Sequence, residues 1–239
     1  MNQSILLKEI RKELKKNIDT VYRDGERRFF KEKVKNYGVR LPDRRKVAAK
    51  YWPKIKHLSK KEIFSLCHRL FASGYNEEFT LASSWVYKLK DQFKSSDFKI
   101  FEAWVKNFVD NWAKCDDFCT HSLGYFIDKY PQFAKNLLLW TKSKNRWVKR
   151  ASAVTLIYPY KKPKKLLTTI FQIAERLLLD SDDMVQKGYG WMLKDASAAH
   201  KQQVFDFVIK HKHHMPRTAL RYAIEKMPQD LKKQAMVKD

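Results

Sequence analysis

Glycine and proline are scarce in this sequence, with six and seven residues respectively in a chain of 239. An all-β protein needs both in quantity for its tight turns, so their scarcity argues against that class. The chain also lacks any run of about 18 uninterrupted apolar residues, which excludes a membrane-spanning helix. Its three cysteines, an odd number, are typical of a reducing compartment without a disulfide framework.

Acidic residues are outnumbered as well: 26 Asp and Glu stand against 50 Lys and Arg, for a net charge of +24. A broadly positive surface favours an anionic partner, nucleic acid first and an acidic membrane surface second. Residues 1–16 alternate charge with apolar residues at helical spacing and lack the apolar core of a signal peptide. We therefore expect a protein that is not secreted and that resides in the cytoplasm.

Apolar residues recur at helical spacing along nearly the whole chain, and no alternating strand pattern competes with them. Pro42 suits the first turn of a helix, and Ser59 with Glu62 forms a capping box. The remaining expected helices cover residues 3–17, 20–36, 76–89, 96–108, 131–142, 145–158, 163–180, 182–197, 200–211 and 216–226. One further helix would hold Trp112 and end before Pro131, so the fold class is all-α.

Five segments repeat one pattern: each begins polar, has small residues near its middle and finishes aliphatic or aromatic. They are residues 77–89, 116–127, 146–157, 183–194 and 216–227, with starts spaced by 39, 30, 37 and 33 residues. This spacing is a degenerate helix-pair period in the range of HEAT-like repeats. We predict a single domain over residues 1–239, an α-solenoid of HEAT-like repeats with a concave basic DNA-binding face.

Residues 110–119 form an aromatic and acidic island in this basic chain. Trp112 and Asp116 are four residues apart, so on a helix the indole and the carboxylate share one face. Two interpretations are open: Trp112 belongs to the core while Asp116 caps or solvates a helix, or the pair lines a functional cleft. Asp117 is a competing carboxylate, and the four-residue step from Trp112 favours Asp116.

A metal site is the other chemistry that this island suggests, through Cys115, Cys119 and His121. Zinc needs about four ligands in workable geometry. The two cysteines share a helical face, His121 does not lie on it, and no fourth ligand is evident. We predict neither a metal nor a cofactor.

Several motifs, in this order along the chain, resemble those of the AlkD-type DNA alkylation repair glycosylases, a family built from HEAT-like repeats. The matching motifs are residues 38–45, Glu77-Glu78 ahead of Ala82, Trp112-x-x-x-Asp116, residues 146–151, residues 187–193 and Arg217-x-x-x-Arg221. Each motif is weak alone, but together, in this order, they are fairly specific. The resemblance spans about residues 5–227.

The resemblance implies an enzyme that excises positively charged N3- and N7-alkylated purines, such as 3-methyladenine and 7-methylguanine, from duplex DNA. Asp116 takes the place of the catalytic carboxylate, and Trp112 and Trp191 take those of the two cleft indoles. Phe29, with Phe30 beside it, occupies a position where the family can present a tyrosine, so an aromatic wall is kept and a hydroxyl is lost. The resemblance also implies that the damaged nucleotide stays stacked in the duplex.

Phosphate contacts would come from basic side chains on the repeat helices, which set affinity without reading sequence. By the resemblance Arg150 takes the place of the phosphate-facing arginine. Further candidates are Arg44, Arg45, Arg146, Lys149, Lys187, Arg217 and Arg221, and each can equally be a solvated surface charge. The lysine-rich residues 161–165 are expected to form a solvated loop.

Two other functions compete with the glycosylase. A relative without catalysis would bind distorted or branched DNA, although both tryptophans and the carboxylate remain in this chain. A HEAT-type scaffold for proteins has no need for a charge of +24. We expect the enzyme to act as a monomer on DNA, without a membrane or an obligate protein partner.

Overall fold

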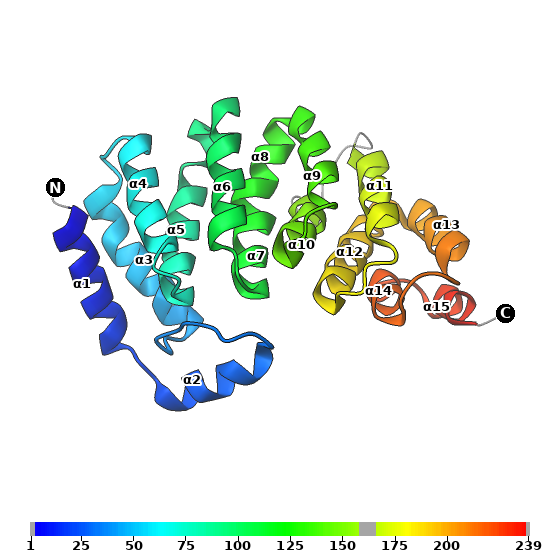
Figure 1. Ribbon diagram of the computed structural model, residues 1–239, viewed down its shortest axis with the longest axis horizontal. Helices are drawn as coiled ribbons and strands as arrows, with labels where there is room; N and C mark the ends of the chain where they lie inside the picture. Colours follow the sequence, from blue (N-terminus) through cyan, green and yellow to red (C-terminus); the bar gives the residue numbers. More distant parts are fainter. Residues whose placement is uncertain (1–2, 158–165, 238–239) are drawn as a thin grey trace. The chain divides into compact units, whose positions relative to one another are not determined.

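The computed structural model describes residues 3–157 and 166–237 (Figure 1). Over these residues the protein is helical without a β-strand, and its one isolated β-bridge joins Lys35 to Tyr75. The all-α prediction is therefore confirmed. The predicted loop at residues 161–165 and the first residues of the predicted helix 163–180 lie outside the described residues. The chain forms two compact units, Met1–Phe118 and Cys119–Asp239, and the single domain stays a prediction.

The first unit contains seven α-helices and three 3₁₀ turns within its described residues. These are α1 (Gln3–Lys16), α2 (Thr20–Glu26), η1 (Arg27–Phe29), α3 (Leu41–Ile55), α4 (Lys60–Phe71), α5 (Asn76–Lys88), η2 (Lys90–Gln92), η3 (Ser95–Asp97), α6 (Phe98–Phe108) and α7 (Trp112–Phe118). Pro42 lies in the first turn of α3, and the Ser59–Glu62 capping box opens α4, both as predicted. The starts of both helices could therefore be predicted from local chemistry alone.

Helix α5 is the centre of the first unit, because it contacts α3, α4 and α7. Trp85 has no exposed surface, and its indole N–H donates to the carbonyl of Ala48 at 3.0 Å. Phe71 of α4 packs its ring against Phe79 of α5, 4.5 Å away, and against Phe118 of α7, 5.9 Å away. Aromatic packing of this kind fixes α7 against the helices that precede it.

The continuous helix predicted over residues 20–36 is wrong. Helix α2 ends at Glu26, the η1 turn follows, and residues 30–40 contain no helix. Gly38 has a φ of +93°, which no right-handed helix contains, and a Cβ there would lie 2.5 Å from the Cβ of Arg23. Phe29, which follows α2, is 75% exposed, so this apolar residue does not mark a buried helix face.

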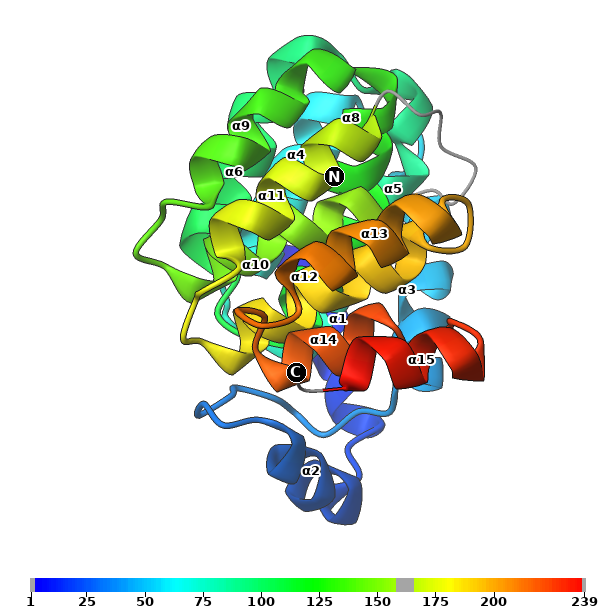
Figure 2. The ribbon, with the colours of Figure 1, turned by 90° about the vertical axis from the view of Figure 1, so that its right-hand side faces the viewer.

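The second unit begins with a π-helical turn and continues with α-helices that follow one another in chain order (Figure 2). Its elements are η4 (Cys119–Leu123), α8 (Gly124–Lys129), η5 (Pro131–Phe133), α9 (Ala134–Trp140), α10 (Arg146–Val154), η6 (Thr155–Ile157), α11 (Leu167–Leu177), α12 (Asp183–Ala196), α13 (Lys201–His211), α14 (Arg217–Ala223) and α15 (Gln229–Met236). Helix α15 was not predicted.

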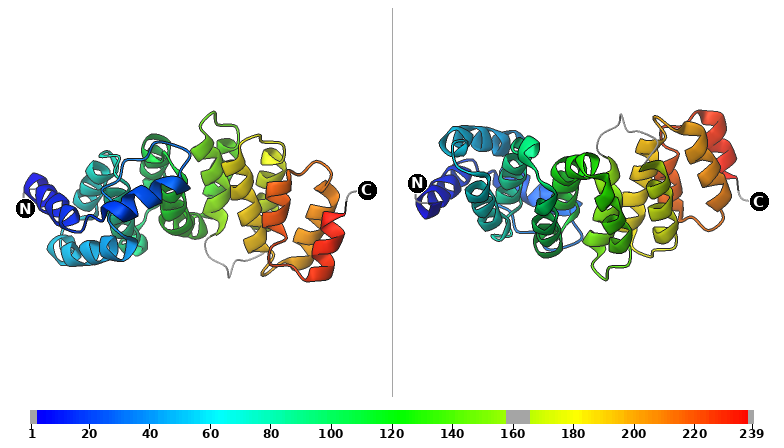
Figure 3. Two further views of the ribbon diagram at one scale, coloured as in Figure 1. Left: turned by 90° about the horizontal axis from the view of Figure 1, so that it is seen from below. Right: turned by 90° about the horizontal axis from the view of Figure 1, so that it is seen from above.

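The predicted repeat helices of the second unit pack on one another, since α10 contacts α12 and α12 contacts α14. Figure 3 shows this succession by colour, from green at α10 to orange at α14. At Gly190, a Cβ would lie 2.8 Å from the carbonyl oxygen of Ala219 and from the Cβ of Tyr222. The small residues of the repeat pattern therefore allow a close helix–helix approach, as predicted. Among the described helices, none is both long and apolar enough to cross a membrane.

We expect Gly190→Ala to destabilise the protein, because its new methyl group meets the backbone of α14. The overpacking lowers the free energy of unfolding by about 1–3 kcal/mol, and the better helix propensity of alanine offsets at most about 1 kcal/mol of this loss. Gly25→Ala is the matched control, since nothing lies within 4 Å of a Cβ at that position of α2. Urea unfolding should show a loss for Gly190→Ala and none for Gly25→Ala; equal stability of the two variants would contradict the close approach.

Candidate functional site

Helix α7 presents Trp112 and Asp116 on a partly exposed face. Its opposite face is buried through Lys114, Cys115 and Phe118, whereas Trp112 and Asp116 are both half-buried. Trp112 is therefore not a core residue, and Asp116 lies inside the helix rather than at its cap. The cleft role of this pair stays a prediction. The competing Asp117 is half-buried on the same helix.

The start of α7 is fixed by buried polar side chains. The Asn111 amide, 1% exposed, donates to Asn76 Oδ1 at 2.9 Å and accepts the backbone N–H of Lys114 at 3.1 Å. The ammonium of Lys114, itself 2% exposed, donates to the carbonyl of Gly74 and to Asp110 Oδ2, both at 2.8 Å. Because these groups are paired within the protein, the position of Trp112 is set before any ligand binds.

Trp112 contacts the segment that follows α2. Its indole ring stacks on Phe30, with ring centroids 5.3 Å apart and planes 18° apart. Its indole N–H donates to the backbone carbonyl of Phe29 at 3.1 Å, while the Phe29 side chain is 75% exposed. The ring that forms a wall beside Trp112 is thus that of Phe30, and a cleft role for the Phe29 side chain stays a prediction.

Glu77 holds this segment in place. Its carboxylate, which has no exposed surface, accepts the backbone N–H groups of Tyr37, Gly38 and Val39 at 2.9–3.1 Å. Arg44 adds its guanidinium at 3.7 Å, and it also donates to the carbonyl of Val39 at 2.6 Å. A buried carboxylate is tolerated only when its hydrogen-bonding capacity is met, and here three amides and an arginine meet it.

Glu78 fixes the same segment through a side chain. The Arg11 guanidinium binds it with two hydrogen bonds of 3.0 Å, and the hydroxyl of Tyr37 donates to it at 2.7 Å. Burial, reinforced by this hydrogen bond, raises the pKa of Tyr37 far above its usual value. The Tyr37 ring also stacks on Tyr75 at 4.0 Å. Sequence reasoning missed this anchoring role, although two adjacent acids in a helix of a very basic chain were a signal for it.

The chain passes from α7 directly into the π-helical turn η4. Such turns are rare and occur frequently at functional sites. This turn begins three residues after Asp116, at Cys119. The sequence contains no signal that would have predicted it.

In the second unit, Trp191 is half-buried on α12, and its role as a cleft indole stays a prediction. Arg150, by contrast, is 5% exposed, and its Nη1 donates to the carbonyl of Met184 at 2.6 Å. A Cβ at Gly188 would lie 3.1 Å from the Cγ of Arg150, so the glycine makes room for the arginine. The phosphate-facing role of Arg150 stays a prediction.

Three of the predicted phosphate contacts hold acidic partners among residues 180–183, in the first turn of α12 or just before it. Arg146 pairs with Asp182 at 2.7 Å, Lys187 pairs with Asp183 at 3.3 Å, and Lys149 pairs with Asp180. A phosphate would have to compete with these carboxylates or share the cations with them. Their role in DNA binding also stays a prediction.

The remaining basic candidates divide by exposure. Arg44 is 6% exposed and pairs with Glu26 at 2.8 Å, so its side chain is engaged inside the protein. Arg45 on α3 and Arg217 and Arg221 on α14 are exposed, and none of the three has an ion pair within the described part of the chain. The contact of these three arginines with phosphate stays a prediction.

The described residues contain no group of three His, Cys, Asp or Glu side chains placed to hold a metal ion. Cys115 and Cys119 are buried, unbridged thiols. The candidate site of the first unit is one partly exposed face of α7, which holds the Trp112 indole, stacked on Phe30, and the Asp116 carboxylate.

These features define a class: a basic, all-helical repeat protein that presents a carboxylate next to an aromatic surface. The sequence profile of the DNA alkylation repair enzyme family matches residues 10–227, and the chain belongs to this family of DNA repair enzymes. It is similar in fold to a structure described as a predicted DNA alkylation repair enzyme from Enterococcus faecalis. That similarity has a TM-score of 0.78 at 14% identity and covers 89% of this chain and 98% of the other. No curated protein sequence matches.

Replacing Glu77 with glutamine should loosen the segment of residues 30–40. One charged acceptor of three backbone N–H groups is lost, which we expect to cost about 1–3 kcal/mol. Hydrogen exchange of the Tyr37, Gly38 and Val39 amides should accelerate relative to the rest of the first unit. Glu225→Gln is the control, because that carboxylate is 57% exposed in its pair with Lys194 and its loss should cost less than about 1 kcal/mol. Unchanged exchange at the three amides would rule out the anchoring role.

Proposed function

We propose that this protein is a DNA glycosylase that excises positively charged N3- and N7-alkylated purines from duplex DNA. The observation that carries the proposal is the shared, partly exposed face of Trp112 and Asp116 on α7, with Phe30 stacked on the indole. Membership of the DNA alkylation repair enzyme family supplies the context of the reaction. The resemblance to the AlkD-type glycosylases points to the same substrates and roles.

The chemistry needs only one carboxylate. Alkylation at N3 or N7 leaves positive charge on the purine, so the base departs neutral when the glycosidic bond breaks. A sugar hydrolase usually needs a second carboxyl group to protonate its leaving group, and this substrate removes that need. Positive charge develops on the deoxyribose instead, where Asp116 stabilises it and orients the attacking water.

The aromatic residues complement a cationic nucleotide. Trp112 and Trp191 each offer a partly exposed indole, and a cation over an aromatic face gains roughly 0.5–2 kcal/mol. Phe30, stacked against Trp112, limits the rotation of that indole and so fixes the surface that meets the nucleotide. Preorganisation of this kind lowers the cost of ordering the site on binding.

The DNA backbone would be held by exposed cations, of which Arg45, Arg217 and Arg221 are the best placed. Arg146, Lys149, Arg150 and Lys187 join them if the phosphates displace their present acceptors. We infer that the protein works as a monomer in the cytoplasm, associates with the nucleoid when bound to DNA, and uses no cofactor.

Asp116→Asn should keep DNA binding and lose base release, because the amide has the shape of the carboxylate without its charge. Loss of one preorganised electrostatic partner typically lowers the rate about 10²–10³-fold. The measurement is single-turnover release of 7-methylguanine and 3-methyladenine from methylated duplex DNA, with binding to the same DNA measured in parallel. Asp117→Asn is the matched control on the same helix and should release base at nearly the wild-type rate. If Asp117→Asn is the inactive variant, the catalytic carboxylate is misassigned.

Phe30→Ala should slow base release more than Phe29→Ala. The Phe30 ring stacks on Trp112, whereas the Phe29 side chain is largely exposed and only its backbone carbonyl contacts the indole. Loss of an aromatic pair removes about 0.5–1.5 kcal/mol, which corresponds to roughly a 2–10-fold lower rate if the indole must be held in place. A larger effect from Phe29→Ala would instead assign the aromatic wall to the exposed ring.

A non-catalytic protein that binds distorted or branched DNA is the second candidate. The contacts of Trp112 favour it, because they leave less of the indole for a nucleotide: one ring face stacks on Phe30, and the N–H donates to the carbonyl of Phe29. Such a protein would bind DNA with a steep salt dependence, losing about 10³–10⁵ in affinity between 50 and 200 mM salt for 6–10 phosphate contacts, and would release no base. Binding with little salt dependence would instead indicate a scaffold for proteins.

A further inference from the structure

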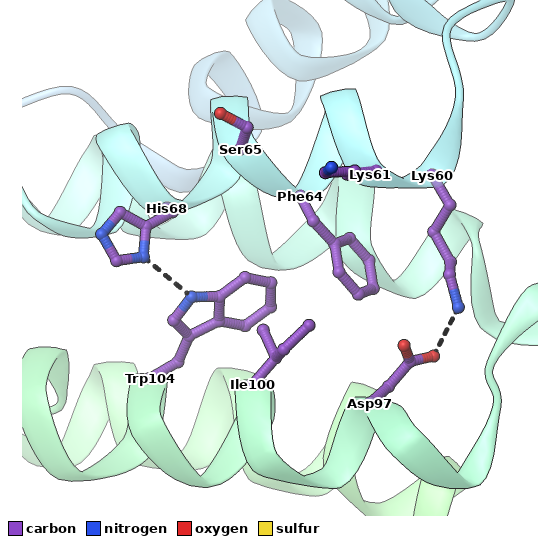
Figure 4. Close-up of a pocket in the computed structure, with 8 residues that line it drawn as sticks. All are labelled: Lys60, Lys61, Phe64, Ser65, His68, Asp97, Ile100 and Trp104. Atoms are coloured by element: carbon purple, nitrogen blue, oxygen red, sulfur yellow. Dashed lines mark hydrogen bonds and ion pairs between the residues drawn. The ribbon is translucent and has the colours of Figure 1, made fainter.

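Helices α4 and α6 of the first unit enclose a groove that the reaction does not use. Its space is about 340 Å³, within the range of about 300–1,000 Å³ that small ligands occupy. Figure 4 shows Phe64 of α4 and Ile100 and Trp104 of α6 pointing toward one another between the two helices. Asp116, Trp112 and Phe30 are not among the residues that line it.

The floor of the groove is apolar and rigid. Phe64 packs edge-on against Trp104, with ring centroids 5.2 Å apart, and both residues are at most 5% exposed. The indole N–H of Trp104 donates to Nδ1 of His68 at 3.3 Å, which fixes the ring. Ile100 is 39% exposed at the mouth of the groove. Ile100 is therefore the accessible apolar side chain of the groove, and the aromatic rings below it are buried.

One end of the groove is basic. Lys60 is held by Asp97 at 2.6 Å and by the carbonyl of Gln92 at 3.1 Å. Lys61, the next residue, is exposed and has no ion pair among the residues that the structure describes. The neighbouring acid on this helix, Glu62, accepts hydrogen bonds from the backbone N–H and the hydroxyl of Ser59 in the capping box. An ammonium thus remains available beside the apolar floor.

We propose that this groove docks an acidic peptide of a partner protein, with one apolar side chain seated against Ile100 and carboxylates beside Lys61. The volume fits one or two side chains rather than a whole helix. A chain of net charge +24 favours acidic partners generally, and Lys61 supplies the local complement. Nucleic acid fits less well, because stacking of bases needs an exposed ring face and the rings here are buried.

The test is fluorescence polarisation with a fluorescein-labelled octapeptide in which one leucine or phenylalanine is flanked by Asp and Glu. We expect a Kd of about 10–100 μM for the wild-type protein. A peptide with alanine at the apolar position, and one with amides in place of the acids, should bind at least about tenfold more weakly. No binding of the acidic peptide at about 1 mM would overturn the proposal.

Two surface variants locate the site. Ile100→Asp should weaken the peptide about tenfold, and Lys61→Glu about fivefold. Lys99→Glu is the matched control, because this exposed residue of α6 undergoes the same charge reversal but does not line the groove. Thermal unfolding would check that the three variants fold. Equal binding by all three would place the peptide elsewhere and refute the assignment.

Two further outcomes would replace the peptide with another occupant. If duplex DNA displaces the peptide and both groove variants lose DNA affinity, the groove is a nucleic-acid contact. If sedimentation shows a dimer that Ile100→Asp dissociates, the occupant is a second copy of this chain. Base release by Ile100→Asp should equal that of the wild type, so this proposal and the glycosylase can fail independently.

Discussion

A carboxylate without exposed surface holds together the part of the first unit on which the candidate site depends. Glu77 accepts three consecutive backbone N–H groups from Tyr37, Gly38 and Val39, and so replaces the helical hydrogen bonds that this segment does not make. Burying the charge alone would cost several kcal/mol, and the three amides with Arg44 offset that cost. The anchored segment carries Phe30 to the indole of Trp112.

The proposed chemistry also depends on the fixed position of one carboxylate, that of Asp116, in a very basic protein. Asp116 is half-buried on a helix whose start is locked by Asn111 and Lys114. A preorganised carboxylate stabilises a developing positive charge without reorganising during the reaction. In the proposed reaction no general acid is needed, because an alkylated purine is already a good leaving group. The simplicity of the site would then follow from the charge of its substrate.

Local and periodic features of the fold could be predicted from the sequence. The capping box at Ser59, Pro42 in the first turn of α3 and the small residue Gly190 act through their immediate neighbours, so their signals are complete in the sequence. The four-residue spacing of Trp112 and Asp116 likewise placed both side chains on one half-buried face.

Features that depend on distant contacts could not be predicted. The extended segment after α2 is held by Glu77, which lies about 40 residues further along the chain. The apolar residues of this segment have helical spacing, so the sequence alone predicts a helix there. The ion pairs of Arg146 and Lys149 were missed because their acidic partners lie more than 30 residues away in the sequence. The pair of Lys187 was missed because Asp183, its partner, looks like an ordinary acid at the start of a helix. Exposure of a basic residue is decided by such partners and not by its own identity.

In the proposed reaction, the positive charge of the damaged base takes the place of a general acid. The most direct measurement compares release of 3-methyladenine with release of its neutral isostere, in which carbon replaces a ring nitrogen and removes the positive charge. Both would be placed in the same duplex and given to the wild-type protein, with binding measured for each. We expect similar binding to both duplexes and release of the cationic base only. Release of both bases at similar rates, or of neither, would contradict it.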